Sequence, residues 1–172
     1  AMYKLSILSS MSFHAHMPIE VIYRAGITKL TKADFETAQL LNYRIKLLAI
    51  GKKDGNKIEV RVHPTMIPVT HPLASVRGVF NAIFLTGHAV DDVMLYGRGA
   101  GCMPTASAVV SDIVYACHHD QRHHYMTFVN EANVSSAVEL VQDFCCIYSI
   151  RLQVADKPGT MAAIAAAFAK QG

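Results

Sequence analysis

The sequence predicts an α+β fold whose strands pair largely in antiparallel fashion, followed by a short strand-and-helix unit at the carboxyl end. Strand patterns at 43–51 and 57–63 flank Lys53-Asp54-Gly55-Asn56, whose Asp-Gly pair is typical of a tight hairpin. Helical patterns stand before, between and after the predicted strands. With 172 residues, 52% of them hydrophobic, the chain can bury one substantial core.

The first predicted element is a helix over residues 2–13. At about 100° per residue Ile7, Leu8 and Met11 share one arc, so we expect this arc to face the core. Lys4 projects on the same arc, between Leu8 and Met11. Two interpretations stay open at this point. The lysine extends its stem along the surface with the ammonium in water, or an apolar surround holds it for a function.

A short strand is predicted at 21–27, and a helix follows from Thr31 to about Leu41. Thr31 and Asp34 have the spacing of a capping box, which opens such helices. In the strand at 57–63 apolar and polar residues alternate, so one face should lie on a core and the other should meet water or a site. The alternating sets are Ile58, Val60 and Val62 on one face, and Glu59, Arg61 and His63 on the other.

Two His-Pro pairs, His63-Pro64 and His71-Pro72, follow this strand. Proline lacks the N–H that a ladder needs, so we expect extended or turn structure there and a break in the sheet. Two apolar strands are then predicted at 81–90 and 92–97.

A glycine-rich turn containing Gly97, Gly99 and Gly101 comes next, and a helix is predicted from Thr105 to about Cys117. Pro104 suits the first turn of that helix, whose small and β-branched residues suit close packing on a sheet. The turn lacks the spacing of a dinucleotide fingerprint and of a P-loop. By pattern alone it is a tight turn or a place where backbone N–H groups meet an anion.

The region from His118 to about Phe144 has little periodicity and is predicted to be a linker or a partly helical connection. One rival hypothesis for it is metal binding, since His119 and His123 would share a helix face with Cys117 nearby. The alternative is a solvated connector, and we predict no metal for the cluster His118, His119, His123 and His124. A strand at 146–156, a turn at 157–160 and a helix at 161–171 follow, which cannot bury their own apolar faces.

Composition excludes several classes of protein. A net charge of +3 without a basic run gives no electrostatic reason to expect nucleic acid. No apolar run reaches the about 18 residues that a membrane span needs. The four cysteines include no CxxC pair, so we expect a reducing compartment and a cytoplasmic protein.

The amino-acid sequences of four stretches give information beyond these patterns. Together they resemble the carboxyl-terminal half of the substrate domain of homoserine dehydrogenase, continuously from about residue 2 to 115. The stretches are KLSILSSMSF, IKLLAIG, IEVRVHPTMIPVTHPLASVRGVFNAIFLTG and VMLYGRGAGCMPTASAVVSDIV. The tail YSIRLQVADKPGTMAAIAAAFAKQG is similar to the first strand and helix of an ACT domain, an amino-acid-sensing module. The implied division is 1–118 partial substrate and dimerisation domain, 119–145 linker and 146–172 truncated ACT-like unit.

This resemblance implies a mixed sheet with helices on one face, whose strands build a homodimer. It also implies hydride transfer between NADP or NAD and the L-homoserine/L-aspartate 4-semialdehyde pair, with threonine as a candidate effector. Lys4 falls on the family's proton-transferring lysine, and His71 on a histidine near the site, although a structural His-Pro turn is an equal alternative. The turn formed by Gly97, Gly99, Ala100 and Gly101 then becomes a wall of the nicotinamide site.

The resemblance does not extend to a Rossmann domain, whose fingerprint is absent from these 172 residues. We therefore expect this chain alone to lack dehydrogenase activity. The alternative hypothesis is a non-enzymatic module that responds to amino acids or binds a partner. A rise in melting temperature with threonine, and none with a nicotinamide cofactor, would distinguish that module.

Overall fold

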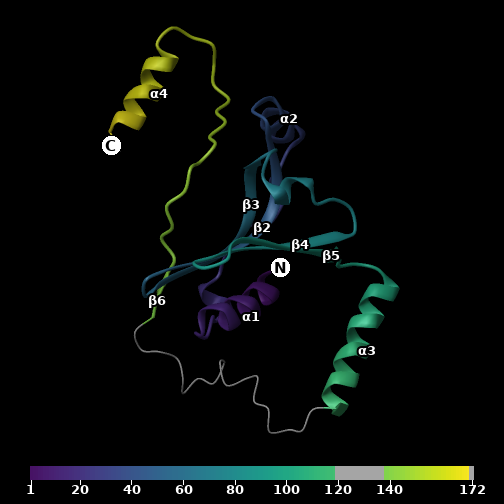
Figure 1. Cartoon of the computed structure of the whole chain (residues 1–172). Coiled ribbons are helices and arrows are strands. Elements are labelled where there is room, and N and C mark those ends of the chain that lie inside the picture. Colours follow the sequence, from purple (N-terminus) through teal and green to yellow (C-terminus); the bar gives the residue numbers. More distant parts are fainter. Residues whose placement is uncertain (119–137, 171–172) are drawn as a thin grey trace.

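The computed structural model of the chain describes residues 1–118 and 138–170. Figure 1 shows sheets in the middle, α1 below them, α2 at one end, and α3 and α4 standing away from the rest. In chain order the elements are α1 (Met2–Phe13), η1 (Ile19–Val21), β1 (Tyr23–Arg24), α2 (Lys32–Leu40), β2 (Tyr43–Asp54), β3 (Lys57–Pro68), η2 (Pro72–Ser75), β4 (Phe80–Gly87), β5 (Asp91–Arg98), α3 (Cys102–His118), β6 (Glu139–Val141) and α4 (Thr160–Ala169).

The larger sheet is mixed. Strands β2 and β3 pair in antiparallel fashion from Tyr43↔Pro68 to Asp54↔Lys57, and the hairpin turns at Gly55–Asn56 as predicted. On its other edge β3 takes two short parallel partners, β1 opposite Arg61–Val62 and β6 opposite Lys57–Glu59. Strands β4 and β5 form a separate antiparallel ribbon. The fold is therefore mixed α/β, and β1 is shorter than the strand predicted at 21–27.

Pro64 does not interrupt β3, so the break predicted at His63-Pro64 is wrong, whereas His71-Pro72 lies beyond the end of β3 at a short helix, as predicted. The carbonyl of Val62 accepts a hydrogen bond from Ala25 N–H at 2.8 Å, so the backbone groups of Val62 point away from β2, toward the edge of β3 that β1 occupies. Every second residue of β3 points its backbone groups to this same edge. Pro64, two residues on, has its nitrogen on this edge too. Strand β1 ends at Arg24, opposite Val62, so the described ladder requires no N–H from the proline.

The core lies between α1 and one face of β3. Its members come from α1, from the chain that follows α1, and from alternate positions of β3: Leu5, Ala15, Met17, Ile22, Ile58, Val60 and Val62. Met17 and Ile58 have no exposed surface. The alternation in 57–63 therefore predicted the core face of β3 correctly.

The side of α1 that faces this core is not the predicted one. The buried residues of α1 are Leu5, Ser9 and Ser10, whereas Ile7, Leu8 and Met11 are exposed. Two serine hydroxyls bond the backbone of Met17, where the chain returns across the helix. Ser10 Oγ accepts from Met17 N–H at 3.0 Å, and Ser6 Oγ donates to the Met17 carbonyl at 2.6 Å. Because its hydroxyl is paired in this way, Ser10 can be buried at little cost in free energy.

The capping box of α2 is confirmed. Asp34 Oδ2 accepts hydrogen bonds from Thr31 N–H and from Thr31 Oγ1–H, both at 2.7 Å. Helix α3 begins at Cys102, one turn before the predicted start, with Pro104 in its first turn. No residue of α3 is buried, so the predicted close packing of this helix on a sheet is wrong for the described residues. None of the described helices is both long and apolar enough to cross a membrane.

The carboxyl-terminal part differs most from expectation. Residues 146–156 form no strand, because no described strand pairs with them and an extended segment needs a partner to become one. A strand, β6, instead lies inside the range predicted to be a linker. Helix α4 forms as predicted, and none of its residues is buried. The predicted linker residues 119–137, with His119, His123 and His124, lie outside the described residues.

Candidate functional site

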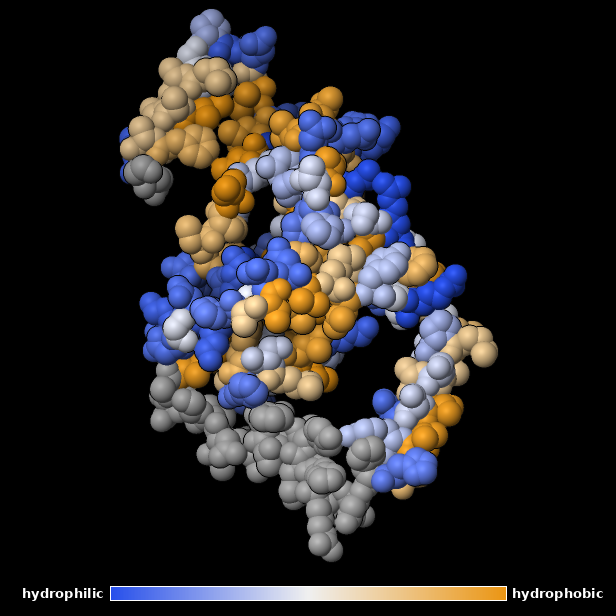
Figure 2. Space-filling view, in the orientation of Figure 1, coloured by the Kyte–Doolittle hydropathy of each residue, from blue (hydrophilic) through white to orange (hydrophobic). Residues whose placement is uncertain are grey.

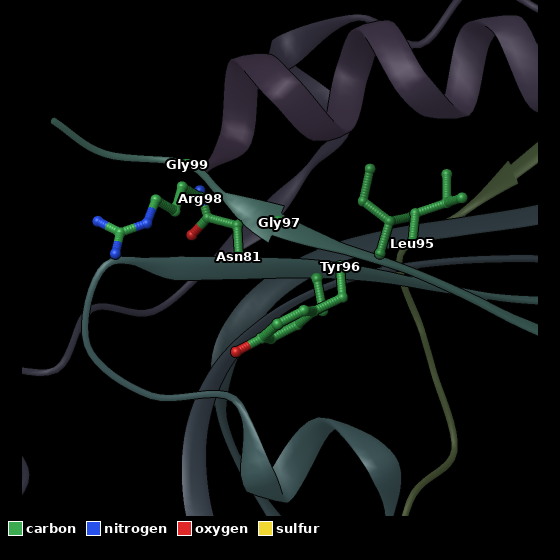
Figure 3. A pocket seen from close by; sticks show the side chains of 8 residues that line it. Asn81, Leu95, Tyr96, Gly97, Arg98 and Gly99 are labelled. Carbon is green, nitrogen blue, oxygen red and sulfur yellow. The ribbon is translucent and has the colours of Figure 1, made fainter. Parts of the chain in front are cut away.

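The glycine turn joins the end of β5 to the start of α3. Gly99 N–H donates to the Val79 carbonyl at 3.0 Å, which folds the turn back on the chain ahead of β4. A Cβ atom on Gly99 would lie 1.5 Å from Asn81 Nδ2, so Asn81 occupies the space of a side chain, as Figure 3 shows. Gly101 has φ 122°, a conformation that side chains disfavour. Glycine is thus required at 99 by close approach and at 101 by backbone conformation.

A shallow hollow of about 260 Å³ lies beside this turn on the β4–β5 ribbon (Figure 3). It is lined by residues 81–83 of β4 and 95–99 at the end of β5. Of the predicted site residues, Gly97 and Gly99 belong to this lining, whereas Lys4, His71, Ala100 and Gly101 do not. A Cβ on Gly97 would meet nothing within 4 Å, so the backbone there is open to a ligand.

Two polar residues of this hollow, Asn81 and Arg98, were missed in the sequence. The ring of Phe80 stacks on Tyr96 with centroids 4.9 Å apart, and the Arg98 guanidinium lies 5.5 Å from the Phe80 centroid. Such a cation–π contact orients the arginine beside the glycines. In the sequence, the position of Arg98 between Gly97 and Gly99 could have marked it as a site residue. Asn81 gave a weaker signal, as a polar residue at the start of an apolar strand.

Lys4 lies on the first turn of α1, and its side chain is exposed in the described chain. The neighbouring apolar residues Ile7 and Leu8 are 62% and 42% exposed, so the apolar surround expected from the helical wheel is not formed by these residues alone. The lysine and this uncovered stripe share one face of α1. Enclosure of the amine therefore requires a further surface against that face.

His71 caps the short helix η2. Its Nδ1 accepts a hydrogen bond from Leu73 N–H at 3.1 Å, and its ring lies 5.0 Å from that of Phe84 on β4. These contacts give the His-Pro pair a structural task. They also fix the imidazole, half-buried, where η2 meets the β4–β5 ribbon.

Lys46 on β2 is a further residue that pattern reading did not single out. Its Nζ donates to the Val76 carbonyl at the end of η2. Burial lowers the pKa of this amine, and the nearby positive charges of Arg44 and Arg77 lower it further. Lys46 thus joins the hairpin to the turn that carries His71, and it adds to a group of cations there.

Metal ligands are not gathered anywhere in the described part of the chain. Within residues 1–118 and 138–170 no three His, Cys, Asp or Glu side chains lie together as a metal site would require. The four cysteines are free. The hypothesis of a histidine metal site concerns residues of which most lie outside these ranges.

The two glycines in the hollow should respond differently to alanine. We expect Gly99→Ala to lower the free energy of unfolding by about 1–3 kcal/mol, because the new methyl group overlaps Asn81 down to its Cβ. Gly97→Ala is the matched control and should change it by less than about 0.5 kcal/mol, since that space is empty. Urea denaturation of both variants measures the difference. Equal effects would contradict the packing described here.

Comparison with known proteins places the chain in a family. The family model described as homoserine dehydrogenase matches residues 1–114. The chain belongs to the homoserine dehydrogenase family. A curated homoserine dehydrogenase from Mycobacterium leprae is 40% identical over 98% of the chain and 39% of its own length. One from Pseudomonas aeruginosa is 36% identical over the whole chain and 41% of its length.

Solved homoserine dehydrogenases agree with this assignment. The crystal structure from Thiobacillus denitrificans superposes with a TM-score of 0.70 at 39% identity, over 81% of this chain and 33% of that one. The S. aureus homoserine dehydrogenase at pH 7.5 gives a TM-score of 0.61 at 40% identity, over 67% and 29%. The chain thus spans about two-fifths of the length of the curated relatives. The family model takes in Lys4, His71 and the whole glycine turn, whereas β6 and α4 lie beyond its end and are matched by the curated relatives.

Proposed function

We propose that this chain is the substrate-side part of a homoserine dehydrogenase. The complete protein would interconvert L-homoserine and L-aspartate 4-semialdehyde on the route to threonine and methionine, in the cytoplasm. The observation that carries the proposal is the family match over residues 1–114, which includes each proposed site residue. The four free cysteines fit a reducing compartment.

The residues present fit a nicotinamide cofactor at the glycine turn. Gly97 leaves bare backbone open beside the hollow, so a flat ring could approach it without meeting a side chain. The cofactor, NADP or NAD, would accept or supply the hydride. In this proposal Gly97, Gly99, Ala100 and Gly101 form a wall for the ring and exclude water from one side of it.

In this proposal Lys4 is the residue that transfers a proton to and from the substrate oxygen. During oxidation of homoserine the Lys4 amine would accept the proton of the substrate hydroxyl, while the bound cofactor would supply the hydride chemistry. In the reverse direction the Lys4 ammonium returns the proton to the developing alkoxide. His71, fixed by η2, would contribute to the shape of the site. The exposed Lys4 face of α1 would be enclosed by the dinucleotide-binding part of the longer protein.

The proposal is tested by a chimera. The corresponding two-fifths of a curated relative is replaced by these 172 residues, and the chimera and the isolated chain are assayed for homoserine-dependent reduction of NADP and NAD. We expect turnover by the chimera and none by the isolated chain, which contains no dinucleotide fingerprint. A folded chimera without activity would contradict the proposal. The same inactivity, with a melting temperature of the isolated chain that rises with threonine alone, would favour the non-enzymatic alternative.

A homodimer is part of the same proposal. One face of the β4–β5 ribbon carries four apolar side chains that are 38–56% exposed, namely Ile83, Leu85, Val93 and Leu95. Figure 2 shows apolar surface gathered over this region of the molecule. Since such a face is unfavourable in water, we expect a second copy to cover it. Sedimentation at micromolar concentration should give a dimer, and Leu85→Glu, a change on the same face but outside the lining of the hollow, should shift it to monomer. A monomeric parent chain would refute this.

A further inference from the structure

Residues 138–151 run back over the larger sheet from far along the chain. Strand β6 adds to the outer edge of β3 with the pairs Lys57↔Glu139, Ile58↔Leu140 and Glu59↔Val141. Glu139 N–H donates to the Asn56 carbonyl at 2.9 Å. In Figure 1 the chain leaves β6 and passes along the molecule to α4. The first attachment of this segment is therefore backbone pairing to an otherwise open edge.

Phe144 strengthens this attachment on the polar face of β3. Its ring lies 4.5 Å from the Arg61 guanidinium and stacks on His63 with an interplanar angle of 5° and centroids 5.9 Å apart. Tyr23 of β1 flanks it at 5.3 Å. The sequence left open whether this face of β3 meets water or a site, and in the structure Phe144 covers it.

The ring of Phe144 covers a buried charge, the guanidinium of Arg61. Arg61 is 3% exposed, forms an ion pair with Glu59, and donates from Nε to His63 Nε2 at 3.1 Å. A buried guanidinium is tolerated only where its charge is paired and its surroundings are fixed. Loss of the Phe144 ring would admit water to this group, so β6, Phe144 and the Arg61 pair support one another.

The second attachment lies at the start of α2. Arg151 Nη2 is 3.1 Å from Asp34 Oδ1, and it donates to Thr31 Oγ1 at 3.1 Å. Asp34 is also the N3 residue of the α2 capping box, and hydrogen bonds from the Thr31 backbone and side chain lower the pKa of its carboxyl group. It is therefore charged and ready to pair at neutral pH. An exposed ion pair of this kind is weak by itself.

Between the two attachments the segment has little support. Ile147 is fully exposed, and Tyr148 and Ile150 are 68% and 60% exposed. Only residues 145–150 separate Phe144 from Arg151, so each attachment holds the other close to its partner at a high effective concentration. Two weak contacts joined by a short tether bind more firmly together than either does alone.

We propose that residues 138–151 form a strap that docks as one cooperative unit, with β6 and Phe144 as one anchor and Arg151 as the other. The strap ties α4 to both α2 and the edge of β3. Release of one anchor weakens the other. A movement of α4 that displaces Arg151 therefore also loosens Phe144 from the buried Arg61 and its partners Glu59 and His63. The inference is independent of the proposed catalytic function, because it concerns contacts outside the glycine turn.

Hydrogen exchange of the 172-residue chain tests the coupling from one end. Asp34→Asn removes the charge that Arg151 pairs with, while its side-chain oxygen still accepts from Thr31. We expect the Glu139 amide, at the far anchor, to exchange about two- to fivefold faster. Glu36→Gln is the matched control, since Glu36 is an exposed α2 carboxylate that pairs only with Lys32 among the ion pairs observed for the described residues, and it should leave this rate unchanged.

Proteolysis tests the coupling from the other end without touching α2. Phe144→Ala should speed tryptic cleavage after Arg151 about tenfold, whereas Ile147→Ala, at a fully exposed position of the same segment, should not. An unchanged Glu139 exchange rate in Asp34→Asn, or an unchanged cleavage rate in Phe144→Ala, would show that the anchors act independently and would overturn the strap. Circular dichroism confirms that each variant is folded.

Discussion

Substitution of Lys4 by methionine is expected to lower kcat of the active chimera by about 10²–10⁴-fold, the usual contribution of a general acid or base. Methionine keeps the length and apolar stem of lysine and removes the amine. Since Lys4 is exposed on α1 and supports none of the core, its loss should leave folding unchanged. The measurement is steady-state kinetics in both directions, with thermal denaturation as the check on folding.

A matched lysine separates proton transfer from a general effect of charge. Lys29 lies in the loop between β1 and α2, is exposed, and has no proposed role. Lys29→Met should retain kcat within about twofold. In an active chimera, a Lys4→Met variant with kcat near that of its parent would remove Lys4 from the mechanism.

Truncation of Ile58 to alanine should be the most damaging single change in the core. Ile58 has no exposed surface and lies where α1, β3 and β6 meet. Large-to-small substitutions at such positions cost about 2–5 kcal/mol, from lost transfer free energy and from the cavity left behind. Urea denaturation of the full chain measures the loss as a lower midpoint at an unchanged slope.

The control for this change is the same substitution at an exposed position. Ile147 is fully exposed, so Ile147→Ala should alter the free energy of unfolding by no more than about 0.5 kcal/mol. If both variants lost equal stability, the effect would have to come from the denatured state instead of the packed core.

The local signals in this sequence were reliable where the cause is local. The capping box at Thr31 and Asp34 and the hairpin turn at Gly55–Asn56 both form as predicted, because each depends on residues within a few positions of one another. The prediction failed at 146–156, since a strand exists only where another strand pairs with it. It failed again at Pro64, where an open sheet edge made the missing N–H harmless.

The candidate site also has features that the sequence indicated and contacts that only the structure revealed. Glycine spacing and the family resemblance led directly to the turn at 97–101 and to Lys4. They gave no indication that Asn81 lies against Gly99, or that Phe80 holds Arg98 beside the turn, since these contacts join β4 to β5. Lys46 was missed for a similar reason, because its carbonyl partner lies 30 residues further along the chain.

By itself the sequence determined which segments are helical, where the main hairpin turns, and which family the chain belongs to. The tertiary structure alone decided which side of α1 is buried. Gly51 of β2 leaves room for Ser9 and Phe13 to approach, and Met17 returns to bond the helix serines. Helix period fixes which residues share a face, but the partners that satisfy a buried hydroxyl come from elsewhere in the chain. That is why the serine face lies inward and the apolar stripe beside Lys4 remains outside.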